Sequence, residues 1–208
     1  GWYDLISYLA PPIIAESAYV CKRKTDFFEI SNGKIAKRLF LRRTLCYNKH
    51  NMCKQGVVLN FPYQYKSENE MQTERLGAAF AAYVLKHRIA GKCTFVALQG
   101  DLGAGKTAFV RGAVGVLCAG ARVQSPSYTV VNEYRGGTIP IFHFDVYRLE
   151  TEDDLYSIGF FDYLEEDALC FCEWSEKISA YIPQHRYTVL IRKSENESER
   201  AIIISEEK

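Results

Sequence analysis

The sequence feature that most constrains the fold lies between Phe95 and Leu117. An apolar run over residues 95–98 leads into residues 100–107, which read GDLGAGKT and match G-x-x-x-x-G-K-[ST] at every fixed position. A segment with apolar residues at helical spacing follows, to about Leu117. Because this motif binds phosphate where a strand, a glycine loop and a helix follow one another, the stretch predicts an α/β fold arranged around the loop.

The loop contains the residue types that bind a polyphosphate. Its glycines have no Cβ, so several backbone N–H groups can surround one anion, and the helix that begins near Lys106 adds free amides and the positive end of its dipole. Lys106 is expected to reach the β- and γ-phosphates, and the hydroxyl of Thr107 to ligate Mg²⁺. The predicted nucleotide-binding residues of the loop are Gly100, Asp101, Leu102, Gly103, Ala104, Gly105, Lys106, Thr107 and Ala108.

Two further strands end in acids. Residues 138–145 are largely apolar and finish at Asp145, in the form of a Walker B strand whose acid holds Mg²⁺ directly or through water. Residues 168–172 form an apolar run that delivers Glu173 and Trp174. Glu173 either completes the metal shell or orients the attacking water, the alternative being a surface acid that happens to follow a strand. Trp174 is open to two interpretations, packing or contact with nucleotide or partner.

A polar loop after the first loop helix is the candidate switch. Residues 123–129 read VQSPSYT, and in nucleotide-binding proteins of this class such a segment approaches the γ-phosphate and the metal. Its hydroxyl-bearing candidates are Ser125, Ser127 and Thr129.

The remaining elements complete an α/β domain. They predict a three-layer P-loop NTPase fold with a mixed sheet, in which a parallel core is extended by antiparallel hairpins. The expected elements are a strand at 57–61, a helix capped by Ser67 with Glu70 in a capping box and ending near His87, strands at 129–134 and 138–145 joined at Gly136-Gly137, a short helix and turn within 152–167, and a closing hairpin of 187–193 and 200–205.

Charge divides the chain at about residue 55. Residues 1–55 carry ten Lys or Arg and four Asp or Glu, a net charge of +6, while the whole chain of 208 residues has a net charge of +1. We expect a P-loop domain at 56–208 and a basic N-terminal extension of uncertain structure at 1–55. The extension either contacts RNA or another polyanion, or is poorly folded. A further interpretation takes Met52 as an internal start, with the residues upstream of it foreign to the domain.

Composition limits the compartment. No run approaches the ~18 apolar residues of a membrane span, which predicts a soluble protein without membrane contact. Seven cysteines, an odd number without a Cys-x-x-Cys pair, favour a reducing compartment such as the cytoplasm. The four histidines show no zinc-ligand spacing with them, so no structural metal is expected.

Several ordered motifs resemble one family, the small bacterial ATPase TsaE, also called YjeE, of tRNA threonylcarbamoyladenosine (t6A) synthesis. The resemblance covers residues 56–208. The segments similar to family motifs are 73–77 (TERLG, for T-x-x-L-G), 100–107 (the Walker A motif), 125–129 (SPSYT, for S-P-T-[FY]-[ST]), 144–149 (FDVYRL, for F-D-x-Y-R-L) and 173–174 (EW). Ser127 stands where the family usually has threonine, which keeps the hydroxyl and loses a methyl that restricts χ1. Residues 1–55 have no counterpart in the compact bacterial form.

The resemblance implies an activity and a partner. It implies Mg²⁺-dependent ATP hydrolysis, weak in the isolated protein and stimulated by a TsaB–TsaD pair, which modifies adenosine 37 of tRNA. It further implies that Lys106, Asp145 and Glu173 are catalytic, that Thr107, Asp145 and Glu173 serve the metal, and that Thr73, Trp174 and Arg200 lie near the nucleotide. Two other classes stay open from the residues alone: a small P-loop kinase, and a binding module that nucleotide stabilises without turnover.

Overall fold

The computed structural model describes residues 20–23, 26–31, 34–37 and 59–208. The chain divides into two compact units, Gly1–Tyr47 and Asn48–Lys208. In the first unit the backbone forms a three-stranded antiparallel sheet in the order β1-β2-β3, with β1 at Val20–Arg23, β2 at Asp26–Ser31 and β3 at Lys34–Lys37. The domain boundary predicted between residues 55 and 56 lies outside the described residues.

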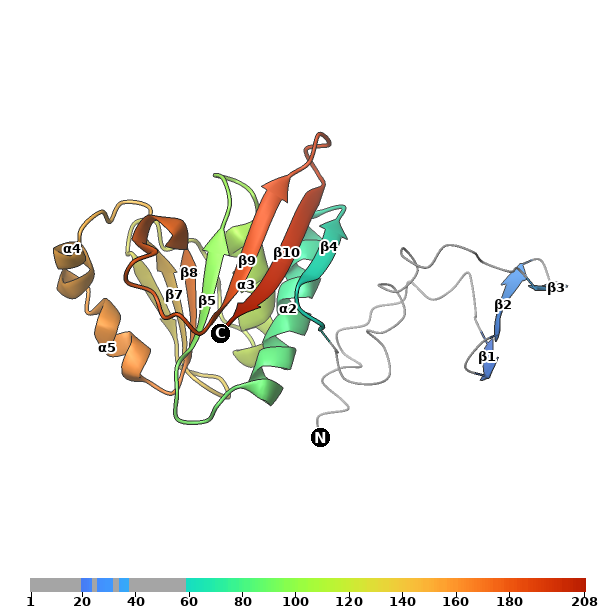
Figure 1. The fold of residues 1–208 in the computed structure, drawn as a ribbon, viewed down its shortest axis with the longest axis horizontal. Helices are drawn as coiled ribbons and strands as arrows, with labels where there is room; N and C mark the ends of the chain where they lie inside the picture. The colour runs from blue at the N-terminus through green and yellow to red at the C-terminus, as the bar shows by residue number, and fades with distance from the viewer. Residues whose placement is uncertain (1–19, 24–25, 32–33, 38–58) are drawn as a thin grey trace. The chain divides into compact units, whose positions relative to one another are not determined.

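A seven-stranded mixed sheet is the centre of the second unit (Figure 1). Its order is β4-β10-β9-β5-β8-β7-β6, in which β5 pairs in parallel with both β8 and β9, and β7 pairs in parallel with β8. The pairs β6/β7, β9/β10 and β10/β4 are antiparallel, so the predicted parallel core with antiparallel hairpins is confirmed. The strands are β4 (Tyr63–Ser67), β5 (Thr94–Gln99), β6 (Val131–Tyr134), β7 (Ile141–Asp145), β8 (Leu169–Glu173), β9 (Arg186–Lys193) and β10 (Arg200–Glu207).

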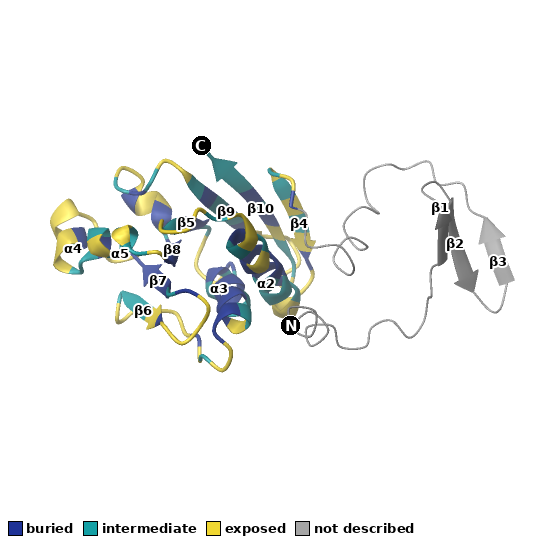
Figure 2. Cartoon of the chain, turned by 90° about the horizontal axis from the view of Figure 1, so that it is seen from below, coloured by how far each residue is buried: buried dark blue, intermediate teal, exposed yellow. Residues whose placement is uncertain are grey.

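Helices cover both faces of this sheet. Residues of α2 (Glu70–His87) and α3 (Lys106–Leu117) share a core with Val96 and Leu98 of β5. Their neighbours Phe95 and Ala97 point the other way, into a core shared with α4 (Glu152–Ser157), α5 (Phe160–Glu165) and the 3-10 helix η1 (Ser175–Ile178). Because side chains alternate along a strand, one apolar run supplies both cores. The predicted three layers are confirmed, and burial is greatest in the central strands β5, β7 and β8 (Figure 2).

Two glycines bring α2 and α3 into close contact. A Cβ on Gly77 would lie 2.0 Å from the carbonyl oxygen of Phe109, and a Cβ on Gly112 would lie 1.8 Å from that of Glu74. Both distances are far below van der Waals contact, so only glycine permits this spacing of the two helices. The contact matters for the site, because α3 begins at the glycine loop.

Two expectations at the start of the domain are wrong. The first strand of the large sheet is Tyr63–Ser67 rather than 57–61: residues 59–62 are not in a strand, and residues 57–58 lie outside the described part. Leu59 is nevertheless buried, so its apolar character reflects packing rather than strand pairing. The N-cap of α2 is Asn69, whose side chain accepts from the backbone N–H of Gln72, and not Ser67.

Other predicted elements are confirmed with small shifts. Helix α2 ends at His87 and α3 at Leu117, as the periodicity indicates. The segment 152–167 contains two short helices separated by Gly159, which adopts a φ of +69°. A capping box does occur, at the start of α4, between Thr151 and Asp154. Within the described ranges, none of the helices combines the length and apolar character needed to cross a membrane.

Candidate nucleotide-binding site

A cavity of about 480 Å³ lies beside the glycine loop, where β5, β7 and β8 end. Parallel strands place their carboxyl ends at one edge, and this edge is where open α/β sheets bind ligands. The cavity is lined by Glu70, Thr73, Leu102, Gly103, Ala104, Gly105, Lys106, Thr107, Ala108, Arg111, Ser125, Ser127, Asp145, Tyr147, Glu173, Trp174, Ser198 and Arg200.

The backbone of the loop explains its glycines. Gly100, Gly103 and Gly105 have φ values of +134°, +71° and +110°, which residues with a Cβ rarely adopt. A Cβ on Gly100 would also lie 2.1 Å from the carbonyl oxygen of Ile191 in β9. Gly105 is the N-cap of α3 and has no side chain to accept from the first amides, so these amides stay available to an anion.

Lys106 turns back over the loop that precedes it. Its Nζ donates to the carbonyl oxygens of Gly100 at 2.6 Å and Asp101 at 3.1 Å, and lies 3.7 Å from the centroid of the Trp174 ring. The residue is 4% exposed. Burial lowers the pKa of Lys106, and the negative charge of Glu173 opposes that shift. Gly100 and Asp101 therefore contribute to the site through their carbonyl groups, although they do not line the cavity.

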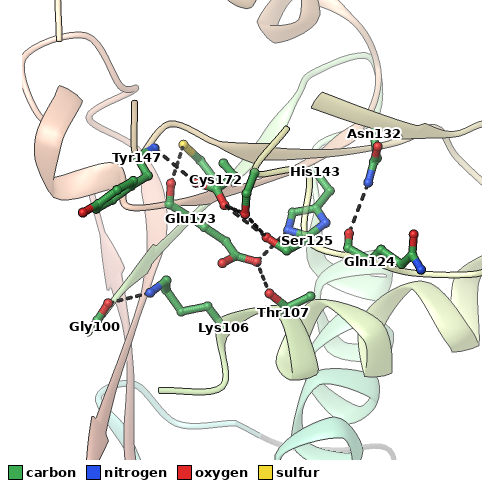
Figure 3. A network of polar contacts seen from close by, with 12 residues as sticks. Gly100, Lys106, Thr107, Gln124, Ser125, Asn132, His143, Tyr147, Cys172 and Glu173 are labelled. Atoms are coloured by element: carbon green, nitrogen blue, oxygen red, sulfur yellow. Dashed lines mark hydrogen bonds and ion pairs between the residues drawn. The ribbon is translucent and has the colours of Figure 1, made fainter. Parts of the chain in front are cut away.

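One carboxylate oxygen of Glu173 connects two strands and a helix, namely β8, β7 and α3. Glu173 ends β8, and its Oε1 accepts from Thr107 Oγ1 of α3 at 2.7 Å and contacts Nε2 of His143 in β7 at 2.8 Å (Figure 3). Glu173 is 3% exposed and His143 is fully buried. The carboxylate is thus fixed between the loop helix and the adjacent strand, which is inconsistent with a surface acid.

Asp145 holds the candidate switch. Its Oδ2 accepts from Ser127 Oγ at 2.7 Å and from Ser125 Oγ at 3.1 Å, while its Oδ1 accepts from the backbone N–H of Tyr147 at 3.1 Å. The two serine hydroxyls also lie 2.7 Å apart. The loop at 123–129 is therefore tied to the end of β7 by its two serines.

The third switch candidate lies elsewhere. The hydroxyl of Thr129 donates to Asn132 Oδ1 at 3.1 Å, and Thr129 does not line the cavity. It instead stabilises the turn before β6, where Val130 has a φ of +66°.

Trp174, Thr73 and Arg200 lie around the cavity in different roles. Trp174 has a φ of +64°, and its ring packs against that of Tyr147 with centroids 4.8 Å apart and planes inclined by 52°. Thr73 is buried, with its hydroxyl 2.8 Å from that of Ser67. Arg200 donates to the carbonyl oxygens of Ala104 at 2.9 Å and Gly103 at 3.3 Å, so it joins the β9–β10 hairpin to the loop.

Sequence reasoning missed three contributors. His143 has no zinc-ligand spacing with the cysteines, but its place two residues before Asp145 puts both on the same face of β7. Arg111 and Glu70 line the cavity and pair with each other at 2.7 Å, and Arg111 also pairs with Glu74 at 2.6 Å. Helical spacing places Arg111 one turn after Thr107 on α3, which is the signal that could have found it.

The polar groups of the cavity fit a hard divalent cation. Thr107, Asp145 and Glu173 offer only oxygen donors, which Mg²⁺ prefers. Among the described residues, no three His, Cys, Asp or Glu side chains gather into a metal-binding group. A cation here would therefore take part of its coordination from phosphate and water, which is usual for Mg²⁺ in nucleotide sites.

Comparison with known proteins identifies the family to which this chain belongs. The family model described as "Threonylcarbamoyl adenosine biosynthesis protein TsaE" matches residues 67–202. The chain belongs to the TsaE family.

Relatives and a solved structure support this membership. The TsaE protein of Haemophilus influenzae is 40% identical over 116 residues, 56% of this chain and 73% of that protein. The Bacillus subtilis TsaE protein is 32% identical over 139 residues, covering 67% and 82%. The crystal structure of Bacillus subtilis YdiB matches with a TM-score of 0.54 and 29% identity, over 68% of this chain and 84% of that one. The P-loop NTPase fold predicted from the motifs is confirmed.

Proposed function

We propose that this TsaE-family chain hydrolyses ATP to ADP and phosphate, with Mg²⁺, in the biosynthesis of t6A on tRNA. The biosynthetic role follows from the family, since the matching relatives are named tRNA threonylcarbamoyladenosine biosynthesis proteins. The activity is proposed from the site. One observation carries it: Lys106, Thr107, Asp145 and Glu173 converge from separate elements on one cavity beside the glycine loop.

Each group has a distinct part in this proposal. The loop amides and the start of α3 bind the phosphates, and Lys106 exchanges its two carbonyl contacts for phosphate oxygens. Thr107, Asp145 and Glu173 would hold Mg²⁺, which when bound neutralises charge that develops on the phosphate oxygens. Glu173 is buried beside the loop, where it either ligates the cation or orients the attacking water.

The arginines of the cavity argue against a kinase. Phosphoryl transfer to a second substrate usually draws on several free cationic groups around the transferred phosphate. Within residues 59–208, Arg111 and Arg200 are the only arginines that line the cavity. Arg111 is paired with Glu70 and Glu74, and Arg200 is bonded to loop carbonyl oxygens. Hydrolysis needs fewer such groups, so water is the favoured acceptor.

The partner in this proposal is a TsaB–TsaD pair, through which the protein acts on tRNA indirectly. We expect weak ATP hydrolysis by the isolated chain and stimulation by the pair. The site contains a physical reason for a low basal rate: Oδ2 of Asp145 accepts from Ser125 and Ser127, so these contacts must rearrange before a cation can take that oxygen.

Phosphate release from purified protein, with and without TsaB–TsaD, tests the proposal. Glu173→Ala should reduce the rate at least about 100-fold while the protein stays folded, because the group that fixes metal or water is lost. Glu165→Ala, at an exposed acid of α5, is the matched control and should keep the wild-type rate. Equal rates for Glu173→Ala and the wild type would remove Glu173 from the mechanism. Nucleotide binding without any release would favour the binding module.

A further inference from the structure

His143 is a buried polar group that the proposed function does not use. It lies in the centre of β7 with no exposed surface, and Nε2 is 2.8 Å from Glu173 Oε1. Its other ring nitrogen, Nδ1, is buried without a hydrogen-bond partner among the described residues. A buried imidazole is costly to retain unless its polar atoms are used, and here only one of them is.

The two contacts of Glu173 define which ring nitrogen carries the hydrogen. A carboxylate oxygen only accepts, so the approach of Nε2 at 2.8 Å requires a hydrogen on Nε2. The geometry therefore indicates that Nε2 carries a hydrogen and donates it to Glu173.

We infer that His143 is a positioning residue that fixes the Glu173 carboxylate for the metal and the nucleotide. His143 and Thr107 donate to the same oxygen, Oε1, from two sides (Figure 3). Both donors that residues 59–208 supply to this carboxylate reach Oε1, which leaves Oε2 to ligand or water. Two fixed donors on one oxygen stop rotation of the carboxylate, and binding a cation then requires little further ordering. Strand β7 therefore contributes twice to the site: it ends in Asp145, and its His143 orients Glu173. The inference rests on the proposed function.

A pair of substitutions separates positioning from mere packing. H143F keeps a buried ring without the donor, whereas H143Q places an amide N–H near the position of Nε2. Nucleotide binding is measured by calorimetry with and without Mg²⁺. The Kd without Mg²⁺ divided by the Kd with Mg²⁺ reports how much the cation strengthens binding. We expect H143F to reduce that ratio at least about fivefold and kcat at least tenfold, with the Mg²⁺-free Kd changed less than about threefold. H143Q should recover most of both. If H143F matches the wild type, or if folded H143Q is as impaired as folded H143F, the inference is overturned.

A second measurement needs no variant to fold. In ¹⁵N-histidine spectra of the wild-type protein, His143 should show a hydrogen on Nε2, and the signal should shift when Mg²⁺ and nucleotide are added. Hydrogen on Nδ1 alone, or a signal indifferent to Mg²⁺, would refute the role of the contact. Both binding readouts are independent of turnover. If wild-type protein with TsaB–TsaD releases no phosphate, the proposed function fails, while the Kd ratio and the spectra still decide the role of His143.

Discussion

At the scale of single residues, Lys106 shows how a charged group is kept in a nearly buried position. Its ammonium is surrounded by two carbonyl oxygens and an aromatic face, which partly replace water. Burial still lowers its pKa, so part of the loss of hydration is not compensated. A phosphate in the cavity would supply the missing negative charge, and binding free energy is therefore concentrated at this residue.

Lys106→Ala tests how much of the nucleotide-binding free energy depends on this residue. We expect the Kd for nucleotide to rise at least about 100-fold, a change of roughly 3 kcal/mol, because a partly buried charge contact with phosphate is removed. Calorimetry measures this directly. Lys92→Ala, at an exposed position before β5, controls for the loss of one positive charge and should leave the Kd unchanged. Wild-type affinity in Lys106→Ala would contradict the phosphate assignment.

At the scale of elements, the contact between α2 and α3 fixes where the loop helix begins. Gly77 and Gly112 each face a carbonyl group of the opposite helix. Helix α2 brings Thr73 to the cavity, and α3 brings Lys106 and Thr107. The spacing of the two helices therefore sets the spacing of the groups around the ligand.

Two alanine substitutions in the same helix make this testable. Gly112→Ala should destabilise the domain by about 3 kcal/mol, since the new methyl group would lie 1.8 Å from a backbone oxygen and the helices must separate. Gly115→Ala, three residues later, meets no atom within 4 Å and should stabilise by about 0.5–1 kcal/mol through helix propensity. Urea denaturation measures both free energies of unfolding. If both substitutions changed the free energy of unfolding by similar amounts in the same direction, the close contact between α2 and α3 would not require glycine at position 112.

At the scale of the whole molecule, six phenol groups contribute to the response of stability to alkaline pH. Burial is the first cause of a raised pKa at five of them, and the hydrogen bond to Glu133 is the first cause at Tyr163. Burial raises the pKa of Tyr187 to about 12 from a reference of 10.0. The tyrosines with raised pKa values are Tyr63, Tyr65, Tyr83, Tyr134, Tyr163 and Tyr187.

The sign of the effect follows from proton binding. Above pH 10 the unfolded chain loses phenol protons that the folded protein retains, so the free energy of unfolding falls as pH rises toward 12. Tyr187 contributes about 2 kcal/mol to this loss. The lowered pKa values of Lys106 and Cys93 act in the opposite direction, whereas burial raises the pKa values of Cys170 and Cys172, which act with the tyrosines. Denaturation midpoints between pH 9 and 11.5 measure the slope, which Tyr187→Phe should reduce. Stability that is constant or rising over this range would contradict the assignment.

The sequence alone determines the local parts of this protein. The glycine loop, α3 and the end of α2 are set by residue types and 3.6-residue spacing, so the motif and the periodicity predict them closely. Acids at the ends of β7 and β8 are likewise visible as apolar runs that finish in Asp145 and Glu173. These features depend on neighbours within a few positions, which is the range over which a sequence pattern carries information.

Only the tertiary structure decided which distant groups meet. His143 and Glu173 are 30 positions apart, and Arg200 reaches the carbonyl of Ala104 across 96. These contacts exist because β9 pairs with β5 beside the loop and β7 pairs with β8, and hydrophobic burial selects that order of strands without any local signal. The shift of the first strand to Tyr63–Ser67 has the same origin, since packing of Leu59 and pairing of β4 with β10 are both non-local.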